Sequence, residues 1–323
     1  MKTKNRYNYY FIILSVLLIF YMLLYPKEIT SSAFNALKMW AEKVVPSLFP
    51  FIVAVNIFIS AYIHLPKIFD TISRRLFGFN GTVFTSALFS IAAGFPAGAK
   101  TALENRKKHL MDSKSTEAYL CLSLNASPAF IMSTTANGFL SCPESAVILM
   151  FSTVFGNIIA AFIMSRQTAS NPKAIYACSK PETYDFFSVF SSSVKTATET
   201  VIKVGGYIVF FAVLSEILEL SGIIDVISKA IILFTGTDTM LIKGILSGLL
   251  EMTNGVKNIS LSQAGINIKI IASAFILSFG GLCVHFQSFE FLKDCGCKLK
   301  DIIKARLICA VLSLCICFII LEI

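Results

Sequence analysis

Helix-breaking and polar residues interrupt two apolar segments in the first half of this chain, and their types suit the binding of a small charged ligand. One break is Gly94-Phe95-Pro96-Ala97-Gly98, with Lys100 just after it, and the other is Asn125-Ala126-Ser127-Pro128. The proline of the second break frees a backbone carbonyl one turn earlier, while the asparagine and the serine offer side-chain hydrogen bonds. A helix that starts at such a break directs backbone N–H groups and partial positive charge toward it, which suits an anionic group.

The second half of the chain carries two breaks at matching places. Glu251-Met252-Thr253-Asn254-Gly255 follows a short apolar run, and Ser278-Phe279-Gly280-Gly281 interrupts a longer one. His285 and Gln287 follow the last break, and we expect the histidine near the membrane interface, in the last turns of its segment. Four breaks that meet near the midplane would form a cavity. Its predicted substrate-binding residues are Gly94, Pro96, Gly98, Lys100, Asn125, Ser127, Glu251, Thr253, Asn254, Ser278 and Gly280.

Each of the polar candidates also has a structural interpretation. Lys100, and the matching Lys257 after the third break, could pair with a substrate carboxylate, but either could equally extend to the membrane interface or pair with a protein carboxylate. An acid within an apolar segment is a functional candidate, so Glu251 could bind a proton or a cation; an ion pair with Lys243 or Lys257 is the alternative. Asn125 and the serine that follows could equally form hydrogen bonds between helices.

The breaks lie within a stretch of sequence, residues 45–135, that recurs about 156 positions further along the chain. Four short matches occur in the same order at a nearly constant offset. They pair Phe51-Ile52-Val53 with Tyr207-Ile208-Val209, Asp70-Thr71-Ile72-Ser73 with Asp225-Val226-Ile227-Ser228, Gly98-Ala99-Lys100 with Gly255-Val256-Lys257, and Leu122-Ser123-Leu124 with Leu277-Ser278-Phe279. Inverted repeats of this kind are typical of secondary transporters, whose substrate sites lie between the copies.

The composition is that of a membrane protein. The chain is 55% hydrophobic and only 15% charged, with a mean hydropathy of +0.74. A soluble domain of 323 residues could not bury that much apolar surface, so we predict an all-α polytopic membrane protein whose main partner is the lipid bilayer. The net charge of +9 is then interpreted by the positive-inside rule. The chain contains no basic run interleaved with aromatic residues, so a nucleic-acid-binding groove is not indicated.

Two regions are predicted to be re-entrant hairpins. Residues 81–110 and 238–265 each consist of a short apolar arm, one of the breaks and a more polar second arm. Each apolar arm is too short to cross the roughly 30 Å hydrocarbon core alone. Amphipathic interfacial helices at about 66–79 and 222–236 precede the hairpins. The predicted full spans are 9–25, 46–64, 117–138, 144–165, 201–220, 268–290 and 303–321.

The positive charges predict the orientation. With a cytoplasmic N-terminus and both hairpins returning to their own side, the cytoplasmic segments hold 20 of the 28 lysines and arginines, counting Lys203, Lys304 and Arg306 at the inner ends of spans. Each copy then contains an odd number of full spans, so the second copy must be inverted. The predicted organisation is an N-terminal transmembrane helix (1–27), a first repeat (28–165), a cytoplasmic linker with an amphipathic segment (166–200) and a second, inverted repeat (201–323).

No enzyme or metal motif competes with this interpretation. The chain has no Gly-x-Ser-x-Gly, no His-Glu-x-x-His, no phosphate-binding loop and no dinucleotide motif in a β-α-β setting. Cys295-Gly296-Cys297 has the wrong spacing for a zinc knuckle and lacks a second pair. We therefore expect no catalytic activity, no cofactor and no metal site.

Three motifs carry a resemblance to a known family: Pro46-Ser47-Leu48-Phe49-Pro50-Phe51, Gly94-Phe95-Pro96-Ala97-Gly98-Ala99-Lys100 and Asn125-Ala126-Ser127-Pro128. In these strings the chain resembles the YlbJ (SpoVV-type) sporulation integral membrane proteins of the nucleoside-recognition "gate" group. The resemblance implies a role in endospore formation, moving dipicolinate across the outer forespore membrane. It also implies a fold similar to concentrative nucleoside transporters, with two re-entrant hairpins and two broken helices, although the ligand motifs of those transporters are not reproduced here.

The expected function is therefore transport of a small anionic metabolite, dipicolinate in particular, by alternating access at a midplane site. Two alternatives stay open: a carrier of nucleosides or other small solutes, and a non-transporting membrane assembly factor of sporulation. Matching polar breaks and matching lysines in both copies favour transport, because an assembly factor does not need them. The sequence leaves a homo-oligomer open.

Overall fold

Helices are the only regular secondary structure in the part of the chain that the computed structural model describes, which is residues 2–60, 67–167 and 185–322. Four helices in these ranges are long and apolar enough to cross a membrane, or up to six if each of two bent pairs counts as one span. The four are Ser145–Arg166, Phe186–Leu220, Ile266–Cys295 and Leu299–Glu322. The prediction of an all-α polytopic membrane protein is confirmed.

The first half of the chain starts with two helices that meet at a sharp bend of 101°. Side-chain caps then start two later helices: Asn80 Oδ1 accepts from the Val83 N–H, and Asp112 Oδ1 accepts from the Ser115 N–H. The elements are α1 (Lys2–Leu24), α2 (Pro26–Met39), η1 (Trp40–Val44), α3 (Val45–Ser60), α4 (Lys67–Phe77), α5 (Gly81–Ala93), α6 (Ala97–Lys107), α7 (Ser113–Ser123), η2 (Phe130–Phe139) and α8 (Ser145–Gln167).

The second half repeats the order of the first from α3 onward. A long helix is followed by a short amphipathic one, by two short helices in a hairpin, by a helix broken in the middle and by a final long helix. The elements are α9 (Phe186–Leu220), α10 (Ile223–Thr235), α11 (Thr239–Leu250), α12 (Met252–Leu261), α13 (Ile266–Phe279), α14 (Gly281–Leu292), η3 (Lys293–Cys295) and α15 (Leu299–Glu322).

Two predicted spans are interrupted in the structure. The predicted span 268–290 is formed by α13 and α14, which meet at Gly280, and the predicted span 117–138 is formed by α7 and η2, with residues 124–127 outside any helix. Residues 186–200, predicted as an amphipathic segment, are the first part of the uninterrupted α9. The rest of the predicted linker, 168–184, and the end of the span 46–64, from residue 61, lie outside the described residues.

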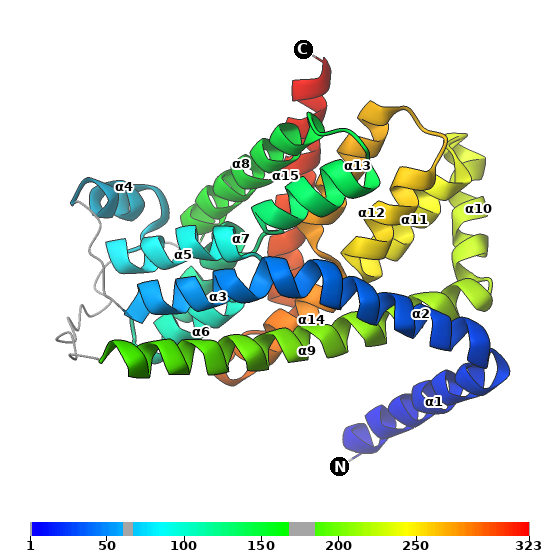
Figure 1. Cartoon of the computed structure of the whole chain (residues 1–323), viewed down its shortest axis with the longest axis horizontal. Helices are drawn as coiled ribbons and strands as arrows, with labels where there is room; N and C mark the ends of the chain where they lie inside the picture. Colours follow the sequence, from blue (N-terminus) through cyan, green and yellow to red (C-terminus); the bar gives the residue numbers. More distant parts are fainter. Residues whose placement is uncertain (1, 61–66, 168–184, 323) are drawn as a thin grey trace.

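The two halves pack against each other reciprocally. Helix α7 contacts α15 while its counterpart α13 contacts α8, and α6 contacts α14 while its counterpart α12 contacts η2. The same two patches meet twice when two similar units are related by a two-fold axis. Near that junction α8 packs along α15, and α2 and α3 pack along the long α9 (Figure 1).

The short sequence matches fall on structurally equivalent positions. In α4 and α10, Ser73 Oγ donates to the Asp70 carbonyl at 3.1 Å and Ser228 Oγ donates to the Asp225 carbonyl at 3.0 Å, and both serines are fully buried. Ile52 of α3 and its match, Ile208 of α9, belong to one hydrophobic cluster between the halves. Two residues that match at an offset of 156 therefore also pack in one cluster between the halves.

Candidate functional site

A small cavity of about 50 Å³ lies where both hairpins, the α7–η2 break and α14 meet. Four of the predicted site residues line it: Gly94, Ser127, Glu251 and Thr253. The other lining residues are mostly apolar: Val44, Leu48, Ala93, Phe95, Ala126, Phe130, Val204, Ile208, Met252, Cys283, Val284 and Gln287. Breaks from both halves of the chain therefore line one cavity.

The tip of the first hairpin approaches the α7–η2 break at backbone distance. Gly94 ends α5 with a φ of +79°, a conformation that favours glycine. A Cβ placed there would lie 2.7 Å from Ser127 Cβ and 2.8 Å from the Ser127 nitrogen, so only glycine fits this contact. Ser127 Oγ in turn accepts from the Phe130 N–H at 3.2 Å and caps the helix that follows the break.

A buried polar network holds the first hairpin to α7. The Tyr119 hydroxyl lies 2.8 Å from Ser86 Oγ and 2.7 Å from Thr101 Oγ1, and Thr101 Oγ1 lies 2.8 Å from Ser90 Oγ. Asn105 Nδ2 adds a hydrogen bond to Ser86 at 2.9 Å. Because buried hydroxyls without partners are costly, this network couples both hairpin arms to the neighbouring helix.

Glu251 is the N-cap of α12 at the tip of the second hairpin. Its Oε1 accepts from the Thr253 N–H at 3.0 Å and from Thr253 Oγ1 at 2.9 Å, and its Oε2 accepts from the Asn254 N–H at 2.9 Å. The side chain is 2% exposed. A carboxylate at a helix N-terminus interacts favourably with the helix dipole, so the fold itself supplies this acid with its partners.

Neither of the lysines considered as ion-pair partners for Glu251 bonds to it. Lys243 forms a salt bridge with Asp225 of α10, and this hydrogen bond holds the pKa of the exposed Asp225 carboxyl below its usual value. Lys257 lies on the second turn of α12, in the lining of a separate and larger cavity. Within the described residues Glu251 takes part in no salt bridge, and that structural alternative is wrong.

The two hairpin tips differ at equivalent positions. An offset of 157 places Gly94 of the first copy opposite Glu251 of the second, as it places Gly98 opposite Gly255. Helix α6 accordingly begins at Pro96 without a side-chain cap, whereas α12 begins at Glu251 with one. The N-terminus of α6 is therefore free of a protein carboxylate, and the N-terminus of α12 is occupied by one.

Arg306, which the positive-inside count places at the inner end of a span, is a buried cation beside the site, near the start of α15. It is fully buried, because the first turns of α15 pack between α7, α8 and α13. The guanidinium donates to the Ser278 carbonyl, to Asn157 Oδ1 at 3.4 Å and to the Cys121 carbonyl at 3.5 Å. These carbonyls belong to the C-terminal turns of α13 and α7, where partial negative charge stabilises a cation.

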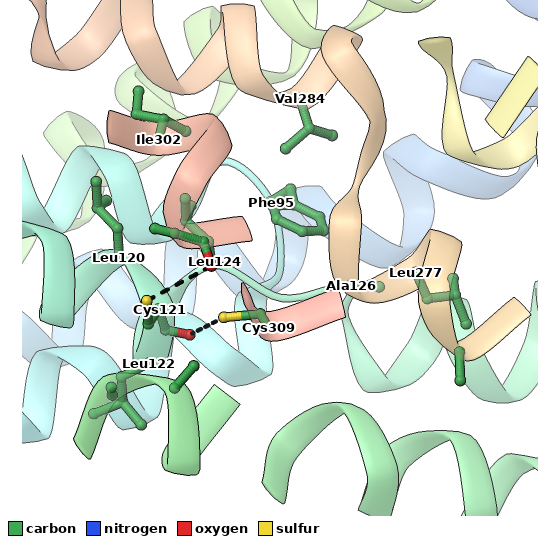
Figure 2. Close-up of a cluster of buried hydrophobic side chains, with 14 of the residues drawn as sticks. Phe95, Leu120, Cys121, Leu122, Leu124, Ala126, Leu277, Val284, Ile302 and Cys309 are labelled. Atoms are coloured by element: carbon green, nitrogen blue, oxygen red, sulfur yellow. Dashed lines mark hydrogen bonds between the residues drawn. The ribbon is translucent and has the colours of Figure 1, made fainter. Parts of the chain in front are cut away.

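The aromatic ring of Phe95 separates Arg306 from the cavity. The guanidinium carbon lies 5.5 Å from the centre of this ring, and Phe95 itself lines the cavity. Figure 2 shows Phe95 and Val284 in the hydrophobic cluster around this junction, with Cys309 bonded to the Cys121 carbonyl beneath them. In the sequence, the signal for this buried cation is a lone arginine directly before the apolar run 307–321. Its position at the start of that run is also typical of an interfacial residue.

Several predicted site residues lie outside the cavity lining. Lys100 is directed to α3, where its Nζ donates to Asn56 Oδ1 at 3.5 Å. Asn125 is 1% exposed, and neither atom of its side-chain amide has a partner among the described residues. Ser278 is engaged with Arg306 and with Ser313, whose Oγ donates at 2.9 Å. The remaining residues outside the lining are Pro96, Gly98, Asn254 and Gly280.

His285 is deep in the structure, so its prediction as an interfacial residue is wrong. Its side chain is fully buried, and Nε2 donates to the Phe279 carbonyl at 2.9 Å. Helix α14 restarts at Gly281 only four residues earlier, which places the histidine in the first turns of a new helix rather than at the end of a long one. Gln287, two residues further on, does reach the cavity.

A vestibule of about 720 Å³ lies beside the cavity, between α2, η2, α9 and α12. Thr253 lines the cavity and the next residue, Asn254, lines the vestibule, so the first turn of α12 separates the two spaces. The vestibule is polar and carries both signs of charge. Its charged residues are Glu28, Lys38, Glu42, Lys43, Glu216, Glu219 and Lys257.

Comparison with known proteins links the chain to one curated relative. No family model matches the chain, and no solved structure matches it, so the expected similarity to concentrative nucleoside transporters and the gate grouping stay predictions. The chain is 24% identical over 307 residues to the sporulation integral membrane protein YlbJ of Bacillus subtilis (strain 168), an alignment that covers 88% of this chain and 75% of that protein. The resemblance in the three motifs is thereby confirmed, and the chain is an integral membrane protein related to YlbJ.

Proposed function

We propose that this protein carries a small anionic metabolite across a membrane by alternating access, and that the metabolite in sporulating cells is dipicolinate. One observation carries the proposal: breaks from both halves of the chain converge on one small cavity beside a large polar vestibule. Irregular backbone is tolerated inside a membrane protein where it lines a cavity, and substrate sites of transporters lie between such repeats. The name of the relative supports a role in sporulation, and the motifs imply the substrate.

The cavity in this structure is smaller than the proposed substrate requires. Ligand sites usually enclose about 300–1,000 Å³, several times the roughly 50 Å³ found here. A planar dicarboxylate therefore needs the walls of the cavity to move apart. The thin barrier formed by the first turn of α12 makes the second hairpin the gate toward the vestibule. The predicted topology, with a cytoplasmic N-terminus, puts this vestibule on the outer side. The resemblance to the YlbJ-type proteins implies that the protein lies in the outer forespore membrane.

The electrostatics of the cavity walls favour an anion at the first hairpin. The N-terminus of α6 has no side-chain cap and follows directly after Gly94 and Phe95, which line the cavity. Arg306 adds a positive charge behind Phe95 without a carboxylate partner among the described residues. A helix N-terminus and a buried cation on the same wall are groups that stabilise negative charge.

Uptake by the purified protein in liposomes tests the proposal. We expect saturable uptake of radiolabelled dipicolinate that pyridine mono- and dicarboxylates inhibit and nucleosides do not. Ser127→Ala removes a hydroxyl from the cavity and should raise the half-saturation concentration about fivefold, because one hydrogen bond contributes about 1 kcal/mol. Ser133→Ala is the matched control, since Ser133 lies exposed six residues later and bonds only to its own helix.

The alternatives give different results in the same assay. Inhibition by nucleosides but not by carboxylates would make the protein a neutral-solute carrier. An assembly factor would show no uptake of any solute above empty liposomes, and the transport proposal would then be wrong.

A further inference from the structure

We propose that Glu251 binds a proton together with the transported anion, so that the anion and the proton cross the membrane as a pair. The inference rests on the proposed transport function and names the ion that accompanies the substrate. It follows from the placement of charge around the cavity. Glu251 is the one charged side chain among the lining residues of the described structure, and it is 2% exposed.

The charges near the cavity are balanced before any substrate binds. Glu251 lies on the wall made by the second hairpin, and Arg306 lies behind Phe95 on the wall made by the first. An ionised Glu251 and the guanidinium therefore add to zero across the cavity. An anionic group that enters leaves one negative charge in excess, and an excess charge in a low-dielectric interior is strongly disfavoured. Protonation of Glu251 compensates the charge of one carboxylate of the substrate.

Other titratable groups around the second hairpin are occupied elsewhere or are neutral. Lys243 bonds to Asp225, Lys269 Nζ donates to the Ser260 carbonyl, and His285 donates to the Phe279 carbonyl. Cys283 lines the cavity and accepts from Gln287, and Glu290 is bonded to Lys203 and Tyr207 on the far part of α14. Lys257, Glu216 and Glu219 line the vestibule. Glu251 is therefore the acid that faces a bound anion.

Comparison of the two hairpins shows that the acid is not a requirement of the hairpin fold. The first copy forms the same helix–tip–helix unit with Gly94 at the equivalent position. The carboxylate also has a route to exchange protons, because the residues it bonds lead out of the cavity: Thr253 lines the cavity with it, and Asn254 lines the vestibule. Protonation weakens these charge-assisted bonds to the N-terminus of α12, which couples the proton to the turn that separates cavity and vestibule.

The proton is conserved in each cycle, and one net negative charge crosses with each dipicolinate dianion. The proton adds to Glu251 from the side on which the anion enters, forms one O–H bond and leaves to water on the other side after the anion has left. One proton moves with each anion, and the carboxylate returns ionised.

The test is dipicolinate accumulation in liposomes with the membrane potential clamped at zero. A pH gradient of one unit, acidic outside, should drive up to about tenfold accumulation by the wild type, since one proton across one pH unit corresponds to a factor of ten. Glu251→Gln should show no accumulation above the external concentration, whatever its residual rate of downhill uptake. Glu144→Gln is the matched control; Glu144 is exposed in the loop before α8 and should leave the accumulation unchanged.

Two further measurements keep the test decisive if Glu251→Gln does not fold. The wild type should acidify the liposome lumen when dipicolinate is added outside, as measured by a pH dye trapped in the lumen. The Glu251→Asp variant should still accumulate dipicolinate, because it keeps a titratable carboxyl. Wild-type uptake that ignores the pH gradient and moves no protons would overturn the coupling but leave transport intact. Absence of any wild-type uptake would instead overturn the proposed function.

Discussion

Replacement of Arg306 measures how strongly the buried charge attracts the anion. The guanidinium carbon lies 5.5 Å from the centre of the Phe95 ring, and a ligand atom against the far face of that ring would be about 3.5 Å further on. Two unit charges about 9 Å apart interact by about 1.8 kcal/mol at an effective dielectric constant of about 20, a factor of roughly twenty in affinity. Arg306→Gln should therefore raise the half-saturation concentration for dipicolinate about twentyfold.

Arg306→Lys is the informative control. It keeps the charge and loses the planar fork that reaches the carbonyls of two helices, so packing and hydrogen bonding are impaired in both variants but the charge is removed in only one. We expect uptake by the lysine variant to stay within about threefold of the wild type at saturating substrate, with similar half-saturation. Melting temperatures of both purified variants separate folding from function. Equal half-saturation for Arg306→Gln and Arg306→Lys would refute an electrostatic role.

Two more predictions concern the hairpins. In inverted copies, Lys257, which lines the vestibule, and Lys100, which lies against Asn56, should be accessible from opposite sides of the membrane. In a cysteine-free background, Lys257→Cys should therefore react with a membrane-impermeant maleimide from one side and Lys100→Cys from the other. Labelling of both from the same side would contradict inverted copies. Tyr119→Phe removes the hydroxyl that joins Ser86 to Thr101 and should destabilise the first hairpin by about 1–3 kcal/mol. The measurements are a lower melting temperature and faster amide hydrogen exchange in α5 and α6. An unchanged melting temperature would show that the network does not anchor the hairpin.

The overall layout could be predicted from the sequence because it depends on patterns that lie close together in the chain. Glycine and proline end helices locally, so the breaks at Gly94, Asn125, Glu251 and Gly280 are readable without tertiary information. Apolar length separates the short hairpin arms from the full helices. The order of elements in the two halves then follows from the repeat.

The orientation of individual side chains could not be predicted in the same way. Lys100 and Lys257 match in sequence, but one lies against α3 and the other lines the vestibule, because the two halves occupy different positions in one asymmetric conformation. Arg306 is at the end of an apolar run, where the positive-inside rule assigns it to the interface; its burial depends on the C-terminal carbonyls of two distant helices. The contact between Arg306 and the Cys121 carbonyl joins positions 185 residues apart, and such a contact leaves no local pattern.

The difference between the copies indicates how a nearly symmetric scaffold can have a preferred first movement. Both hairpins share one bond between their arms, Ser90 with Thr101 in the first and Ser247 with Asn258 in the second. Only the first hairpin is also hydrogen-bonded to its neighbouring broken helix, through Tyr119 of α7. The offset of 155 that relates α7 to α13 places Ala274 at the equivalent position of the second copy, and alanine has no hydroxyl. Opening the first hairpin therefore breaks a buried hydroxyl network, whereas opening the second loosens a carboxylate cap that a proton already weakens. Proton binding at the cap and movement of the second hairpin would thus be one event, and the first hairpin would serve as the fixed wall against which the anion binds.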